Sequence, residues 1–173
     1  LNLYREFESE ALRILVPYTK NGMDESVVQS FMAAVQLGLK RRFGGKVDHL
    51  RMVLQDEPGK DGGPRRHYVM LYDSVPGGTG YLHQLLAHDA GTLSDVLKMA
   101  LQAVTSCSCN DDPEKDGCYR CLYQYRLGRS MEQVSRDQAK AVLGELVGAL
   151  DQLERVKTIS EIFINPNFDS VLE

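Results

Sequence analysis

The sequence has no long apolar run and no excess of positive charge. No stretch approaches the roughly 20 consecutive apolar residues of a membrane-spanning helix, so we expect no membrane partner. The formal net charge is −4 and the pI is about 5.6, whereas proteins that bind nucleic acid alone and non-specifically are usually basic. Any contact with nucleic acid must therefore come from a local patch or from a neighbouring domain.

The sequence also lacks an initiator methionine and a signal peptide. The chain begins at Leu1 rather than at a methionine, and no signal peptide opens it. Near the other end, Ser170 and Glu173 have the spacing of a capping box, which would start a helix. We therefore expect the chain to be a piece of a longer protein, and the lack of a secretory mark favours a cytoplasmic location.

Catalytic patterns are scarce as well. The sequence contains no Walker motif, no G-x-G-x-x-G fingerprint and no evident Ser-His-Asp or Cys-His set. Its four histidines are scattered, without the spacing of a metal site. At 173 residues and 43% hydrophobic, the chain can bury a core without disulfides. It is thus predicted to be a globular domain with no catalysis of its own.

Hydrophobic periodicity predicts an α+β fold, a small mixed or antiparallel sheet covered by helices. The expected strands span 11–18, 46–55 and 67–73, and the third is apolar enough to be central. The expected helices span 24–45, 81–88, 91–104 and 135–156, with capping boxes at Ser26–Gln29 and Ser135–Gln138. We divide the chain into an α/β core (1–105), a cysteine knuckle (106–126), a C-terminal helix of the same domain (127–157), and a tail or start of a following domain (158–173).

All four cysteines lie in one short segment, CSCNDDPEKDGCYRC, as Cys107, Cys109, Cys118 and Cys121. A Cys107–Cys109 disulfide would close a strained ring. A redox C-x-x-C would follow a strand and open a helix, whereas Cys118 follows an acidic loop. A single structural zinc held by four thiolates fits better, because Cys107 and Cys109 in extended chain share a face and a turn would align Cys118 with Cys121. With four cysteine ligands, the zinc has no open coordination position for catalysis. A disulfide and a redox pair remain as alternatives for these cysteines.

Tyrosines and arginines alternate after the second cysteine pair. On a helix, Tyr119, Tyr123 and Arg126 would share one face, with Arg120 and Arg129 nearby. Tyrosines stack on bases and arginines hold phosphates, so these five residues are candidate contacts for single-stranded DNA. The alternative is that the tyrosines pack around the zinc and the arginines are solvated.

A glycine-rich turn, DSVPGGTG, separates the third strand from a helix and contains Asp73, Pro76, Gly77, Gly78 and Gly80. Its backbone amides could bind a phosphate at the start of the helix. Alternatively, the glycines allow a sharp turn and close packing. Asp73 either caps this turn or is a buried acid with a role.

Two stretches taken together, LYDSVPGGTGYLHQL and CSC…DGCYRCLYQY, resemble the MZB family, the zinc-binding domain named after mitomycin-repair helicases. The likeness extends from about Glu8 to about Leu153. It implies that the four cysteines hold zinc and that the glycine turn is a family signature. It also implies an ATP-dependent DEAD/DEAH-box superfamily 2 parent, with RecA-like domains upstream, acting in DNA repair or phage defence. The loop between the cysteine pairs is longer than in the compact family form, which indicates a different branch.

We therefore expect a zinc-stabilised accessory domain of a DNA helicase that assists DNA strand binding. The main alternative is a protein-interaction module that docks a helicase motor or partner subunit, with zinc purely structural. A weaker third hypothesis is a free-standing enzyme that uses Asp73 and the glycine turn on a phosphorylated substrate.

Overall fold

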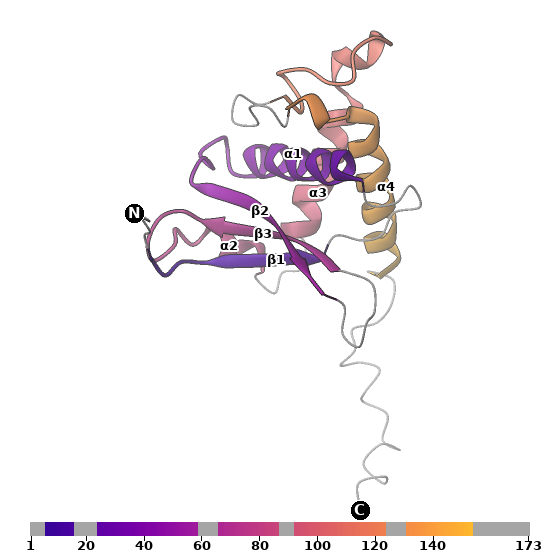
Figure 1. Ribbon diagram of the computed structural model, residues 1–173. Coiled ribbons are helices and arrows are strands. Elements are labelled where there is room, and N and C mark those ends of the chain that lie inside the picture. Colours follow the sequence, from indigo (N-terminus) through magenta and orange to yellow (C-terminus); the bar gives the residue numbers. More distant parts are fainter. Residues whose placement is uncertain (1–5, 16–23, 59–65, 87–91, 124–130, 154–173) are drawn as a thin grey trace, which may run out of the picture.

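The computed structural model describes residues 6–15, 24–58, 66–86, 92–123 and 131–153 (Figure 1). Within these ranges the order of elements follows the predicted one. The elements are β1 (Ala11–Leu15), α1 (Glu25–Arg42), β2 (Leu50–Glu57), β3 (Arg66–Asp73), α2 (Tyr81–Leu85), α3 (Thr92–Thr105), the 3-10 helix η2 (Ser108–Asp111) and α4 (Arg136–Leu153).

The three described strands form one antiparallel sheet in the order β1-β3-β2. Leu71 of the central strand lies opposite Leu12 of β1 and Met52 of β2. Because side chains alternate across a strand, these residues lie on one face of the sheet, and on that face Val69 and Leu71 are completely buried. The central position predicted for β3 from its apolar run is confirmed.

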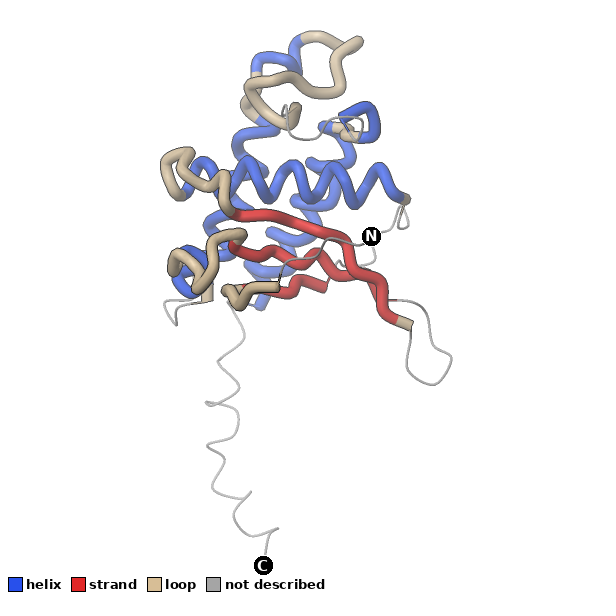
Figure 2. Tube along the Cα trace, turned by 60° about the vertical axis from the view of Figure 1, so that its left-hand side comes forward, coloured by secondary structure: helices blue, strands red, loops and turns tan. Residues whose placement is uncertain are grey.

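Helices α1, α3 and α4 contact one another in pairs and lie together on one side of the sheet (Figure 2). Helix α1 is buried on most of its surface, beyond the single apolar stripe expected from periodicity, because α3 and α4 both pack against it. The resulting core continues into the cysteine segment through Cys109, Cys121 and Leu122. The α+β fold is thus confirmed, and the knuckle is part of its core.

Among the described residues, no helix combines the length and the apolar character needed to cross a membrane.

The capping boxes predicted at Ser135 and Ser26 have different outcomes, and the one predicted at Ser170 lies outside the described residues. At α4, the N–H of Gln138 donates to Ser135 Oγ over 3.2 Å, as expected. At α1, Ser26 lies inside the helix and its hydroxyl instead bonds Gln138 Oε1 at 2.6 Å. The capping box expected at Ser26 is therefore wrong, because a tertiary partner on α4 takes the hydroxyl that local spacing assigned to a cap.

Gly38 allows α1 and α3 to approach closely. A Cβ atom built on Gly38 would lie 2.3 Å from the carbonyl oxygen of Val96. Since backbone cannot move aside cheaply, we expect Gly38→Ala to lower the free energy of unfolding by about 1–3 kcal/mol. Urea unfolding would measure this. Gly144→Ala in α4 is the matched control: nothing lies within 4 Å of its Cβ position, so it should be neutral or stabilise by up to about 1 kcal/mol. Equal effects of the two substitutions would contradict this account of the helix packing.

Candidate metal centre

The four cysteine side chains meet between the end of α3 and the start of α4. Their Sγ atoms all lie within 4.8 Å of one another. Individual Sγ–Sγ distances are 3.5 Å for Cys107–Cys118, 3.7 Å for Cys109–Cys121 and 3.6 Å for Cys118–Cys121. A disulfide requires about 2.05 Å, and all four cysteines are free. Zn–S bonds of about 2.3 Å in a tetrahedron place the sulfurs roughly 3.8 Å apart. The cluster therefore fits one structural zinc ion.

The local backbone explains how each pair converges. The N–H of Cys121 donates to the carbonyl of Cys118 at 3.0 Å, so the second pair lies on one turn, as predicted. The first pair differs from the prediction: Cys107 is extended, but Cys109 lies inside η2. The expectation of a fully extended C-x-C is wrong. The turn of η2 and the Asn110 side-chain amide, which donates to the Cys107 carbonyl at 2.6 Å, bring the two sulfurs to the same point.

Burial makes it costly for some of the thiols to ionise without a metal. Desolvation raises the pKa of Cys121 to about 12. At Cys118, desolvation acts in the same direction, but the N–H of Arg120 and the thiols of Cys107 and Cys121 outweigh it and lower the pKa to about 7. A zinc ion favours the deprotonated form of every thiol that it binds. Metal binding therefore supplies the compensating charge that this partly buried cluster needs.

Residues outside the cysteine segment also reach the cluster. Arg136, which is 7% exposed, donates from Nη1 to the carbonyl of Cys109 at 2.8 Å. Lys140 donates to Asn110 Oδ1. Sequence reasoning missed both of these α4 residues, because an arginine or lysine near the start of a helix gives no signal of a partner some 30 residues away in the chain.

The tyrosines and arginines predicted to share a helical face are arranged differently. Residues 119–122 form a turn, not a helix. Tyr123 is half-buried and its ring packs on Gly117, where a Cβ would lie 2.8 Å from it. Tyr119 is 62% exposed, and Arg120 is exposed beside it. The helix on which the shared face depended is therefore not formed at 119–122, but the rings of Tyr119 and Tyr123 still meet edge to face, with centroids 6.1 Å apart. Arg126 and Arg129 lie outside the described residues.

The glycine turn is held together by bonds within the protein. Gly77, Gly78 and Gly80 have φ angles of 82°, 75° and 81°, which side chains rarely adopt. The N–H of Gly77 donates to the Glu8 carbonyl at 2.8 Å, and that of Gly78 donates to the Val75 carbonyl at 3.0 Å. Pro76 has no N–H to offer. These amides already have acceptors, which favours the structural alternative over a phosphate contact.

Asp73 organises this turn from beneath. The carboxylate is fully buried, and it accepts N–H bonds from Val75 at 2.9 Å and from Thr79 at 2.8 Å. The Thr79 hydroxyl donates to it as well and lies 3.0 Å from His49 Nε2. Desolvation would raise the pKa of Asp73, but these hydrogen bonds outweigh it and lower the pKa. Such engagement favours a cap for the turn over a reacting acid.

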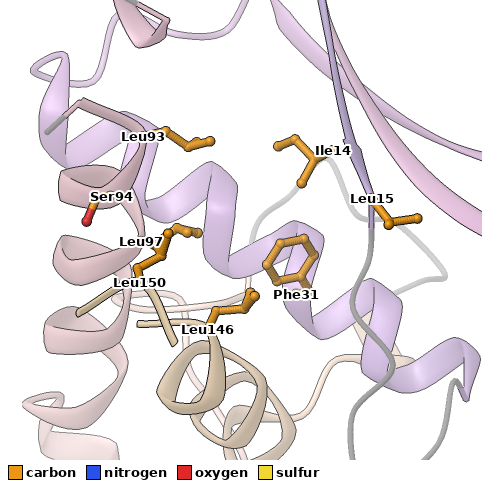
Figure 3. A pocket seen from close by; sticks show the side chains of 8 residues that line it. All are labelled: Ile14, Leu15, Phe31, Leu93, Ser94, Leu97, Leu146 and Leu150. Carbon is orange, nitrogen blue, oxygen red and sulfur yellow. The ribbon is translucent and has the colours of Figure 1, made fainter. Parts of the chain in front are cut away.

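An apolar cavity of about 360 Å³ lies away from the cysteines, where β1, α1, α3 and α4 converge (Figure 3). Among the described residues, Ser94 contributes the one polar side chain of the lining, and its buried hydroxyl has no hydrogen-bond partner there. The other lining residues are Ile14, Leu15, Phe31, Leu93, Leu97, Leu146 and Leu150. The cavity suits apolar groups, and its described lining offers no set of catalytic side chains.

The fold and the cysteine cluster together define a small α+β domain that binds zinc. Residues 31–122 match the family described as the MrfA Zn-binding domain, MZB. Because this match covers more than half of the 173 residues, the chain belongs to that family. The resemblance drawn from the glycine turn and the cysteine segment is confirmed.

The chain is also similar to a solved structure described as the crystal structure of the DUF1998 helicase MrfA bound to DNA, with 20% identity and a TM-score of 0.42. The similarity covers 66% of this chain and 15% of that one, so this chain corresponds to a small part of that protein's length. At this level the likeness carries no argument about function. The comparison with curated proteins gives no match.

Proposed function

We propose that this chain is a zinc-stabilised accessory domain of an ATP-dependent DEAD/DEAH-box DNA helicase and that it assists DNA strand binding. Cys107, Cys109, Cys118 and Cys121 are the zinc ligands in this proposal, and the domain has no catalysis of its own. Upstream RecA-like domains would supply the motor, in a cytoplasmic pathway of DNA repair or phage defence. Membership of the MrfA zinc-binding family supports the helicase context.

The surface next to the cysteine cluster carries the proposed DNA contact. A depression of about 360 Å³ lies there, lined by Cys109 and Cys118 and by the side chains of Ser108, Asp112, Lys115, Tyr119 and Arg120. Tyr119 exposes 62% of its surface there and can stack on a base, while Arg120 beside it can meet a phosphate. Although the whole chain is acidic, this patch combines the two groups that single strands require. The zinc would hold the patch in shape through the turn that contains Cys118 and Cys121.

Replacing Arg120 by alanine tests this contact. We expect weaker binding of the chain to a single-stranded oligonucleotide, with the slope of log affinity against log salt reduced by about 0.7–1, because one phosphate contact is lost. Fluorescence anisotropy at several salt concentrations measures both. Arg51→Ala is the matched control, since Arg51 is exposed on β2, away from the knuckle (Figure 1). An identical salt slope for Arg120→Ala and the unmodified chain would remove the DNA contact from the proposal.

A second candidate function is docking of a helicase motor or partner subunit, and the apolar cavity of Figure 3 favours it. Leu15 at its edge is 53% exposed, so an apolar side chain of another domain could reach it. Absence of DNA binding, together with binding of the chain to isolated RecA-like domains that Leu15→Asp abolishes, would establish this function instead.

A further inference from the structure

A buried cation contacts the cysteine cluster from outside the cysteine segment. Arg136, the first residue of α4, is only 7% exposed. Its Nη1 donates to the carbonyl oxygen of Cys109 at 2.8 Å and lies 3.8 Å from Cys109 Sγ. Its Nε donates to the Asp137 carboxylate at 3.2 Å. One side chain thus contacts both the backbone and the sulfur of a single cysteine.

The charge of a zinc centre gives this contact its meaning. Four thiolates and one Zn²⁺ carry a net charge of −2, and a buried charge is costly unless it is paired. A guanidinium remains protonated at any accessible pH and presents several N–H donors in a planar fork. Lys115 also lies near the cluster, but its side chain is 61% exposed and pairs with Asp112. Arg136 is therefore placed to compensate the buried side of the centre.

The first turn of α4 holds the knuckle at further points. The N–H of Arg136 donates to the Asp116 carbonyl at 3.0 Å, and the N–H of Asp137 donates to the Asp116 carboxylate at 3.1 Å. Lys140 bonds Asn110 on the other side. These contacts orient α4 so that the Arg136 side chain reaches Cys109. The helix is thereby connected to both flanks of the cysteine cluster.

We propose that Arg136 is a positioning residue of the metal centre. It holds Cys109 by its carbonyl oxygen and stabilises the negative charge of the Cys109 thiolate, so zinc affinity depends on it. The inference rests on the zinc site proposed above, because Cys109 must be a ligand. It adds a determinant of affinity that lies 27 residues from Cys109 in the sequence.

Zinc affinity of Arg136→Met tests the inference. Methionine keeps an unbranched apolar stem but removes the charge and the donors. We expect the zinc dissociation constant to rise about 10–100-fold, as for other groups that support metal ligands, measured by competition with a chromophoric chelator. Arg136→Lys keeps the charge without the fork and should restore part of the affinity. Arg51→Met is the matched control, because it removes one positive charge from an exposed side chain on β2, away from the cluster, and its dissociation constant should change less than about threefold.

Cobalt substitution supplies a readout that a purely structural role would not move. In the Co²⁺-loaded chain, the thiolate-to-cobalt charge-transfer absorption should shift in Arg136→Met and remain in place in Arg51→Met. An unchanged dissociation constant and spectrum in Arg136→Met, with only a lower melting temperature, would overturn the inference. If that variant does not fold, Arg136→Lys decides, and wild-type affinity and spectrum would contradict the proposed role. Absence of zinc from the unmodified chain would instead overturn the metal centre itself.

Discussion

Cys121→Ser is expected to abolish tight zinc binding and to unfold much of the domain. Cys121 is 3% exposed and belongs to the hydrophobic core, and its sulfur lies 3.6–3.7 Å from two of the other three. Structural zinc contributes about 10–16 kcal/mol of apparent binding free energy in zinc-finger peptides. A domain is stable by only about 5–15 kcal/mol in total. Losing one ligand should therefore remove most of the stability of the fold, not only that of the knuckle.

Metal content and thermal unfolding together measure this loss. Elemental analysis of protein purified without a metal-affinity tag should give one zinc per unmodified chain and far less for Cys121→Ser. The circular dichroism melt of the unmodified chain should collapse on addition of a chelator, whereas the variant should show no further change. Ser108→Ala is the matched control, because Ser108 is exposed between two of the ligands. One tightly held zinc in Cys121→Ser would show that the ion is bound elsewhere.

Acid should release the zinc in the same assay, because protons compete with the metal for the thiolates. Each thiol must lose its proton to bind the metal, and the buried Cys121 resists this loss most clearly. Without a metal, desolvation raises the pKa of Cys121 to about 12. The zinc content should therefore fall steadily as the pH is lowered from 7. The melting temperature should fall in parallel.

The sequence predicts those features that local spacing or periodicity controls. The apolar run of 67–73 identifies β3 as the central strand, and the C-x-x-C spacing with the preceding Gly117 places Cys118 and Cys121 on one turn. The clustering of all four sulfurs follows from the two pairs and the short loop between them. Each of these depends on residues that are close in the chain.

Features that depend on tertiary partners could not be predicted in this way. The Ser26 hydroxyl fits a local capping box, yet Gln138 on α4 takes it. Arg136 shows no pattern with Cys109 in the sequence, because only the packing of α4 beside the knuckle brings the two together. A helix after Cys118 would have aligned Tyr119 with Tyr123, but residues 119–122 form a turn, and the two rings meet edge to face while only Tyr119 is largely exposed. Local rules thus predict the cysteine cluster but miss the residues of α4 that contact it.

Asp73→Asn is expected to lower the free energy of unfolding by about 2–4 kcal/mol. The buried Asp73 carboxylate accepts bonds from the N–H groups of Val75 and Thr79 and from the Thr79 hydroxyl. A hydrogen bond to a charged group contributes about 1.5–3 kcal/mol, and an asparagine NH₂ group must face at least one of these donors. The glycine turn would then lose its main internal acceptor. Asp95→Asn in the exposed first turn of α3 is the control and should change stability by less than about 1 kcal/mol.

The free energy of unfolding differs between the unmodified chain and Asp73→Asn, and the pH dependence of this difference separates a capping carboxylate from a reacting acid. Desolvation would raise the pKa of Asp73, but hydrogen bonds from Thr79 and Val75 outweigh it and hold the pKa below its ordinary value. Its contribution is therefore fully present above the unfolded-state pKa and is lost only as the pH falls through the lower, folded-state pKa. In urea unfolding between pH 7 and 8.5, where zinc stays bound, the difference between the unmodified chain and Asp73→Asn should stay constant. A difference that changes across this range would mean that Asp73 titrates near neutrality, and the group would then be poised for proton transfer instead of holding the turn.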